Sequence, residues 1–307
     1  MGLDRRLDVY YNMMIEGIVI TPSDKDHGFV RHTSSGKTMT LTTIQFEKQG
    51  KIGIVHLNRP QRMNAVNETM YRDIQAVLNT TRSGDDIRVL LLTGSVYRKN
   101  GQKKQAFCAG ADLKEHATGR RDRQQQRQYI ELAHETTRQL FAYPKPTIAA
   151  INGPARGAGV EMALNCDLIL MADTATLALT ETGLGTFVGG GISAHLPAVV
   201  GVMQAKAMIF TGKVVGGQEA VRLGLALATT PVEKLMDLAL GLAREISEKA
   251  PLSIRLAKTG LQSKVEKDLS STLKFETEAI LSSMETDDWH EGIRSFIEKR
   301  KPVYRGK

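Results

Sequence analysis

Residues 147–161, with the sequence TIAAINGPARGAGVE, contain the clearest structural signal in the chain. Thr147 to Ile151 is a short apolar run of the kind that forms a buried strand, and Pro154 cannot continue it. A helix is expected to open after the small residues, where Gly157 and Gly159 leave its first amides bare. Those amides have no partner inside the helix and carry partial positive charge, so they could hold a developing oxyanion. The alternative is an ordinary strand-to-helix connection.

The same alternation of strands and helices continues on both sides of this segment. Strands are predicted at 43–48, 52–57, 89–93, 167–172 and 176–179, and helices at 67–78, 124–141 and 160–165. Beyond Ala194 the strand signal mostly fades, and helices are predicted at 205–210, 217–223, 231–249, 252–264, 268–283 and 287–300. Strands that alternate with helices predict an α/β fold, here with a helical C-terminal third.

The first 38 residues differ from the rest of the chain. Asp4 and Asp8 break the acid-poor pattern of an organelle transit peptide, and the apolar core of a secretory signal is missing. Residues 21–37 are polar and predict a linker, whereas Met39 begins a strand pattern. We therefore expect a flexible N-terminal extension over residues 1–38, and Met39 is a candidate for the natural start.

The chain is basic, with a formal net charge of +8 and a pI near 9.4. Such a charge favours anionic partners. Two clusters of arginine and lysine, at 98–104 and 120–127, are either solvated surfaces or a rim that attracts a phosphorylated ligand. Cys108 and Cys166 are too few for a secreted disulfide scaffold and favour free thiols, so a cytoplasmic protein is expected. No apolar run approaches the roughly 18 residues of a membrane span.

Two further features contain residues suited to catalysis. Residues 107–114, FCAGADLK, follow a buried strand with small side chains that let a ligand approach backbone N–H groups, although a plain tight turn has the same composition. Glu161 and Glu181 each lie among uncharged neighbours. Such a carboxyl group is either exposed or buried with a raised pKa, and paired carboxyls are typical of general acid–base catalysis. The scattered histidines do not have the spacing of a metal site, so no metal is expected.

From about Leu41 to Lys307 the chain resembles the crotonase superfamily, and within it the enoyl-CoA hydratases. The resemblance rests on motifs that occur in order, namely Leu57-Asn58-Arg59-Pro60 with Asn64-Ala65, then 107–115, 147–167, 231–235 and the tail from Glu291-Gly292 to Arg300. It implies a crotonase-like spiral of ββα repeats as a catalytic core over 39–200, and a helical C-terminal region over 201–307 that takes part in oligomerisation. It also implies a homotrimer or a dimer of trimers.

The catalytic positions of the family correspond to single residues in this chain. Ala111 and Ala158 fall where the family has its two oxyanion-hole amides, and Ala158 replaces the usual glycine without losing the N–H donor. Glu161 and Glu181 fall on the two catalytic glutamates, 20 residues apart.

The resemblance also implies residues that contact the substrate. Contacts with the acyl-CoA are implied for Ala111, Asp112, Leu113 and Lys114, and Gly189 matches a glycine whose amide helps to hold the water. The chain departs from the family pattern at Thr180, where a proline is common, at 192–195, and in the longer, more basic loop 95–105. These departures surround the acyl pocket or its mouth, so they bear on the identity of the substrate more than on the chemistry.

The activity implied by the resemblance is that of an enoyl-CoA hydratase, which adds water to a 2-enoyl-CoA and forms a 3-hydroxyacyl-CoA. Glu161 is expected to activate the water and Glu181 to protonate carbon-2. The substrate is a coenzyme A thioester, and no separate cofactor is expected. Two alternatives within the family are an enoyl-CoA isomerase and a branched-chain hydratase of the methylglutaconyl type.

An alternative of another class is a basic RNA-binding homologue, because the net charge of +8 suits a phosphate backbone. The charge is not accompanied by a motif with stacking aromatic residues. Nucleic acid and membrane are therefore not the expected partners.

Overall fold

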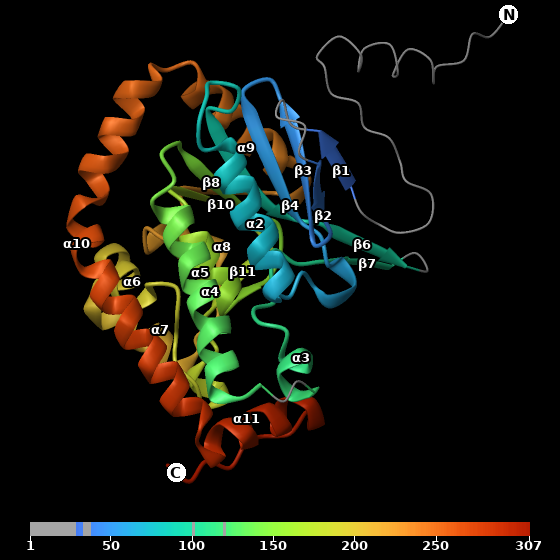
Figure 1. Ribbon diagram of the computed structural model, residues 1–307, viewed down its shortest axis with the longest axis vertical. Coiled ribbons are helices and arrows are strands. Elements are labelled where there is room, and N and C mark those ends of the chain that lie inside the picture. Colours follow the sequence, from blue (N-terminus) through green and yellow to red (C-terminus); the bar gives the residue numbers. More distant parts are fainter. Residues whose placement is uncertain (1–28, 33–37, 100–101, 119–120) are drawn as a thin grey trace, which may run out of the picture.

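A six-stranded sheet forms the centre of the molecule (Figure 1). The computed structural model describes residues 29–32, 38–99, 102–118 and 121–307. In spatial order the strands are β13 (Ala228–Thr230), β10 (Leu168–Ala172), β8 (Thr147–Ile151), β5 (Val89–Gly94), β4 (Ile52–Leu57) and β3 (Ile44–Gln49). Neighbouring strands are parallel except β3, which pairs with β4 in the antiparallel sense. Every residue of β5 and β8 is buried, because both faces of a parallel sheet are covered.

A smaller, three-stranded sheet lies beside the large one. Its strands in order are β12 (Val215–Gly216), β11 (Thr176–Ala178) and β9 (Ala155–Arg156). The chain twice passes from the large sheet to the small one and then into a helix, as β8–β9–α5 (Ala158–Leu164) and as β10–β11–α6 (Ile192–Val200). These two units match the ββα repeat predicted from the sequence, and the α/β architecture is confirmed.

Helices cover both faces of the large sheet. Helices α2 (Glu68–Thr81) and α4 (Arg123–Phe141) pack against each other on one face, and α9 (Leu235–Ser247) packs against β4, β5, β8 and β10. The predicted N-cap of α2 is confirmed, because the Asn67 side chain accepts the Met70 N–H at 3.1 Å. The remaining helices are α3 (Leu113–Thr118), α7 (Val202–Thr211), α8 (Gly217–Arg222), α10 (Pro251–Met284) and α11 (Asp287–Glu298), with short 3₁₀ helices η1 (Pro60–Arg62), η2 (Thr182–Leu184) and η3 (Val232–Lys234).

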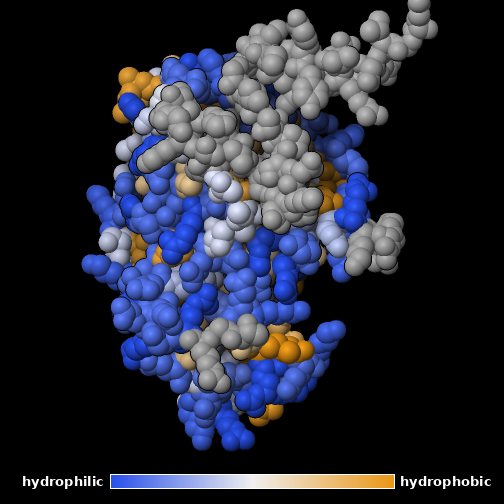
Figure 2. All heavy atoms as spheres, turned by 45° about the vertical axis from the view of Figure 1, so that its right-hand side comes forward, coloured by the Kyte–Doolittle hydropathy of each residue, from blue (hydrophilic) through white to orange (hydrophobic). Residues whose placement is uncertain are grey.

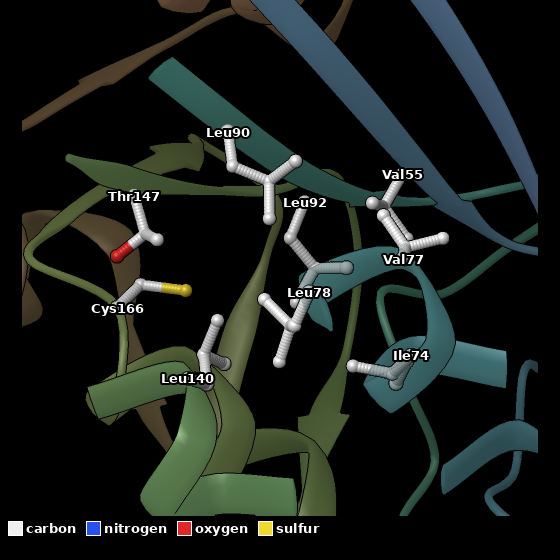
Figure 3. Close-up of a pocket in the computed structure, with 9 residues that line it drawn as sticks. All are labelled: Val55, Ile74, Val77, Leu78, Leu90, Leu92, Leu140, Thr147 and Cys166. Carbon is white, nitrogen blue, oxygen red and sulfur yellow. The ribbon is translucent and has the colours of Figure 1, made fainter. Parts of the chain in front are cut away.

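The core between the sheet and helices α2 and α4 is closely packed. In Figure 3 side chains of β4 and β5, such as Val55 and Leu92, face Ile74 and Leu78 of α2 and Leu140 of α4. The void that they enclose is only about 10 Å³, which is room for at most one water molecule. This part of the core therefore stabilises the fold and is too small for a substrate.

The C-terminal region contains one long helix where the sequence predicted two. The helices expected at 252–264 and 268–283 are a single helix, α10, which packs against α4, α6 and α11 (Figure 1). The expected break was wrong because residues 264–268 include no proline, and Gly260 has open space around it. A single glycine costs a helix only about 1 kcal/mol, which is too little to end it.

Several short strands were also missed by the sequence prediction. Strands β12 and β13 lie beyond Ala194, where only helices were expected. The basic loop 95–105 contains an antiparallel hairpin of β6 (Val96–Lys99) and β7 (Gln102–Gln105). The sequence has Asn100-Gly101 between these strands, a pair favoured in two-residue hairpin turns, but the basic composition concealed this signal.

One strand lies inside the segment predicted to be a linker. Strand β1 (Phe29–His32) pairs in the antiparallel sense with β2 (Thr38–Leu41). The rest of the predicted N-terminal extension, 1–28 and 33–37, lies outside the described residues. The hypothesis that Met39 is the natural start therefore stays a prediction.

Candidate active site

A cavity of about 880 Å³ opens between the loops after the strands and helices α4, α10 and α11. Its wall contains every site residue proposed from the sequence. These residues are Ala111, Asp112, Leu113, Lys114, Ala158, Glu161, Glu181 and Gly189. They come from three segments that are far apart in the chain, so the fold brings the whole predicted set together.

The first loop presents the N–H of Ala111. Val66 pairs with this loop by donating its N–H to the Gly110 carbonyl at 2.8 Å and accepting the Asp112 N–H at 2.9 Å. In a parallel bridge these bonds leave the N–H of the intervening Ala111 on the opposite side. Within the described part of the chain, the Ala111 N–H donates to no other group. It is therefore available to a ligand in the cavity.

The second loop presents the N–H of Ala158. Ala158 is the first residue of α5, so its N–H has no partner inside the helix. Gly159 brings this helix start against the first loop, because a Cβ on Gly159 would lie 2.5 Å from the Cys108 carbonyl oxygen. Arg156 strengthens the contact by donating its N–H to the same oxygen at 2.9 Å. The two alanine amides thus lie on adjacent loops that line one cavity.

Glu161 is buried in the cavity wall, with 7% of its surface exposed. Its Oε1 accepts the N–H of Gly189 at 2.9 Å. In this structure that N–H, which was expected to hold a water, therefore orients the carboxylate. Burial raises the pKa of Glu161 to about 8, and the negative charge of Glu181 adds to the rise.

Glu181 is the N-cap residue that precedes η2 and is similarly buried, with 8% of its surface exposed. Gly157 makes room for its carboxylate, because a Cβ on Gly157 would lie 2.7 Å from Glu181 Oε1. Burial raises the pKa of Glu181 to about 7, and its Oε2 has no hydrogen-bond partner among the described residues. The alternative that the two glutamates are exposed is therefore wrong. Two buried carboxyls that ionise near neutral pH are suited to move protons.

The side chain of Asp112 has a structural partner. Its carboxylate accepts a hydrogen bond from Arg59 Nη2 at 2.9 Å, and the same guanidinium donates to the Ala65 carbonyl at 2.6 Å. This network holds the first loop against the segment after β4. Leu113 packs on the core, and Lys114 is exposed at the edge of the cavity.

Sequence reasoning did not identify the polar residues that helices α2 and α4 contribute to the cavity wall. Tyr71 of α2 and Tyr129 of α4 line the cavity, as does His134 of α4. The Thr277 hydroxyl donates to the Leu273 carbonyl at 2.9 Å, so it accepts from His134 Nδ1 at 3.0 Å. His134 is therefore protonated on Nδ1. Positions 129, 133 and 134 share a helix face, which could have identified this wall, but a buried helix face is more often simply core.

Buried ionisable groups, in the site and elsewhere, make the free energy of unfolding depend on pH. Burial lowers the pKa of His134 and His195 to about 4 each, so the unfolded chain binds more protons as the pH falls from about 6.5 to 4, and stability falls. The raised pKa values of Glu161 and Glu181, about 8 and 7, have the opposite effect: their contribution is complete below about pH 4.5 and is lost as the pH rises through 7 to 8.

We therefore expect the free energy of unfolding to decrease by about 2 kcal/mol between pH 6.5 and pH 9. Urea unfolding at a series of pH values measures this change. The Glu161→Gln variant should lose most of the decrease, because glutamine does not ionise. An unchanged pH dependence in that variant would contradict the raised pKa of Glu161.

Clustered metal ligands and membrane-spanning helices are both missing from the described residues. No group of three or more histidine, cysteine, aspartate or glutamate side chains in the described part of the chain is placed to hold a metal ion. Among the helices that the structure describes, none combines the length and the apolar character needed to cross a bilayer.

The known proteins that resemble this chain agree with one another in family. Residues 47–307 match the family model described as enoyl-CoA hydratase/isomerase. The putative enoyl-CoA hydratase/isomerase YngF of Bacillus subtilis (strain 168) is 39% identical over 259 residues, which are 84% of this chain and 96% of YngF. The crystal structure of an enoyl-CoA hydratase from Bacillus anthracis is 34% identical, with a TM-score of 0.68 over 86% of this chain and 100% of that one.

A methylmalonyl-CoA decarboxylase in complex with 2-nitronate-propionyl-CoA is also similar. It is 29% identical, with a TM-score of 0.73 over 86% of this chain and 99% of that one. The fold and the family predicted from the sequence are thereby confirmed. The chain belongs to the crotonase superfamily of enzymes, in the enoyl-CoA hydratase/isomerase family.

Proposed function

We propose that the protein is an enoyl-CoA hydratase, which adds water reversibly to a 2-enoyl-CoA. The observation that carries this proposal is the burial of Glu161 and Glu181 in the same cavity as the N–H groups of Ala111 and Ala158. An oxyanion hole alone serves many thioester reactions. Two carboxyls beside the oxyanion hole suit the addition of water, because this reaction needs one proton removed from the water and one delivered to the substrate.

In the proposed reaction the thioester oxygen binds between the amides of Ala111 and Ala158. A water molecule lies between the two carboxyls. Glu161 takes one proton from this water while the oxygen of the water bonds to carbon-3. The electron pair of the double bond moves toward the thioester, which becomes an enolate. Glu181 then delivers a proton to carbon-2. Removal of one such amide donor typically costs about 3–4 kcal/mol of transition-state stabilisation.

Before the reaction begins, one of the two carboxyls must be ionised and the other protonated. Burial raises the pKa of both carboxyls, so the pair keeps a proton near neutral pH. Catalysis with Glu161 as the base requires that this proton lie on Glu181. A water that contacts both carboxyls provides the path, because it donates to one and accepts from the other.

The product identifies the reaction. Purified protein is incubated with crotonyl-CoA, a 3-enoyl-CoA, a methylglutaconyl-type substrate and methylmalonyl-CoA, and the thioesters are analysed by mass spectrometry. We expect crotonyl-CoA to gain the mass of one water, with oxygen-18 incorporated from labelled solvent. A 3-enoyl-CoA converted at constant mass would instead identify an isomerase. A gain of water only on the methylglutaconyl-type substrate would identify a branched-chain hydratase. A loss of carbon dioxide from methylmalonyl-CoA would identify a decarboxylase.

We also propose that the chain assembles as a homotrimer or a dimer of trimers. The face in Figure 2 is mainly hydrophilic, with small separate hydrophobic areas. Large exposed apolar side chains occur on α7, such as Met203 and Phe210, and on the first half of α10, such as Leu256 and Leu261. Light scattering on the purified protein measures the assembly.

The free, buried thiols of Cys108 and Cys166 suit a reducing compartment such as the cytoplasm.

A further inference from the structure

The loop that orients Glu161 contains three consecutive glycines, Gly189 to Gly191. Gly190 and Gly191 have φ angles of 67° and 81°, in the left-handed region that favours glycine. Glycine adds flexibility, so such a loop keeps one conformation only if other groups hold it. The position of the Gly189 N–H, which binds Glu161 Oε1 at 2.9 Å, depends on those groups.

Each peptide of this loop is held by a side chain from another element. Glu161 of α5 accepts the Gly189 N–H, and Asn165 Nδ2 donates to the Gly190 carbonyl at 2.8 Å. Glu276 of α10 accepts the Gly191 N–H on Oε2 at 2.8 Å and the Ser193 N–H on Oε1 at 2.9 Å. Glu276 is thus the contact from the C-terminal helix, 85 residues farther along the chain.

Glu276 is fully buried, with 0% of its surface exposed. A buried carboxylate is costly unless hydrogen bonds or opposite charge compensate it. Here both oxygens accept backbone N–H groups, and the carboxylate lies at the N-terminus of α6, where the helix dipole favours negative charge. The Glu276 side chain therefore does more than fill space, because it binds two N–H groups of the loop and the helix start.

We propose that Glu276 is a positioning residue for Glu161, which fixes the Gly189–Gly191 loop and acts on the carboxylate of Glu161 through its negative charge. This inference rests on the proposed hydratase function for its kinetic consequences. It makes helix α10 part of the catalytic apparatus, although α10 contributes neither of the proposed acid–base groups.

Burial raises the pKa of Glu276, while the Ser193 and Gly191 N–H groups lower it and favour the ionised form. The charge of the ionised Glu276 acts together with other groups around Glu161. Burial and the charges of Glu181 and Glu276 raise the pKa of Glu161, while the Gly189 N–H lowers it. The other titratable groups near Glu161 are neutral at physiological pH: Tyr71 of α2, Tyr129 and His134 of α4, and Cys108 of the first loop. Removing the charge of Glu276 should therefore lower the pKa of Glu161.

Two substitutions separate the geometric effect from the charge effect. Glu276→Gln removes the charge and leaves one carbonyl acceptor for the two N–H groups. Glu276→Asp keeps the charge but is one methylene shorter, so it cannot reach both N–H groups. Glu278→Gln is the matched control, because Glu278 lies on the same helix with 59% of its side chain exposed and pairs with Arg127 at the surface.

We expect both Glu276 variants to lower kcat for crotonyl-CoA by roughly 10- to 100-fold with little change in KM, since small displacements of a catalytic group have effects of this size. In Glu276→Gln the acid limb of the kcat–pH profile should move to lower pH, and in Glu276→Asp it should stay in place. Glu278→Gln should match the wild type in both respects. Thermal unfolding of each variant reports any loss of stability separately.

A direct titration makes the test independent of activity. In protein labelled with carbon-13 at the glutamate carboxyls, the resonance that is missing in Glu161→Gln belongs to Glu161. Its titration midpoint should be lower in Glu276→Gln than in the wild type or in Glu278→Gln. If Glu276→Gln alters only the unfolding temperature, and leaves kcat and this midpoint unchanged, the positioning role is overturned. A wild type that titrates as expected but hydrates no enoyl-CoA would instead overturn the proposed function.

Discussion

Replacement of Glu161 by glutamine is expected to lower kcat for the hydration of crotonyl-CoA by about 10³-fold, within the range typical of a lost general base. Glutamine has the shape of glutamate, and its carbonyl oxygen still accepts the Gly189 N–H that binds Oε1 at 2.9 Å. It cannot take a proton from water. The measurement is the initial rate of crotonyl-CoA consumption, with KM determined in parallel.

The stability of this variant provides the control. Burial raises the pKa of Glu161 to about 8, so the ionised carboxylate destabilises the folded state above that pH. Glu161→Gln should therefore be at least as stable as the wild type at pH 9, and a loss of activity cannot be attributed to unfolding. A variant that keeps most of the wild-type kcat would show that Glu161 is not the base.

Replacement of Ala158 by proline is expected to lower kcat by about 10²- to 10³-fold, because it removes one of the two proposed oxyanion donors. Ala158 is the first residue of α5, a position where helices tolerate proline since the N–H has no intrahelical partner. The substitution therefore removes the proposed catalytic contact without removing a hydrogen bond of the fold. The initial rate of crotonyl-CoA consumption measures the effect.

A proline at another helix start tests whether the effect is specific. Asp287 is the first residue of α11 and is exposed. Asp287→Pro should fold and retain most of the wild-type kcat. If Ala158→Pro is folded, as judged by circular dichroism, and as active as Asp287→Pro, the Ala158 N–H is not an oxyanion donor.

The parts of the site that lie close together in sequence could be predicted from it. Residues 147–161 hold a strand, a turn and a helix start within one segment, and small residues at 157–159 are needed there because a Cβ on Gly159 would collide with Cys108. The apolar surroundings of Glu161 left open whether it was exposed or buried. Only the resemblance to the crotonase family related it to Glu181, since no local pattern connects the two residues.

The contacts made by the C-terminal helix could not be predicted in the same way. Glu276 reaches Gly191 across 85 residues, and His134 reaches Thr277 across 143. In the sequence Glu276 is one of several charged residues on a predicted helix, and such residues are usually exposed. The sequence also did not predict that α10 is one continuous helix, because its charged middle section resembles a connection between two helices.

The loss of the conjugated-enone absorbance of crotonyl-CoA, measured for the wild type beside folded Glu161→Gln, decides whether the protein is a hydratase with Glu161 as its base. We predict that the wild type consumes crotonyl-CoA, forms the 3-hydroxy thioester and reaches an equilibrium, while Glu161→Gln shows almost no consumption. A wild type that is inert toward crotonyl-CoA and toward longer and branched 2-enoyl-CoAs would contradict the proposed hydratase activity.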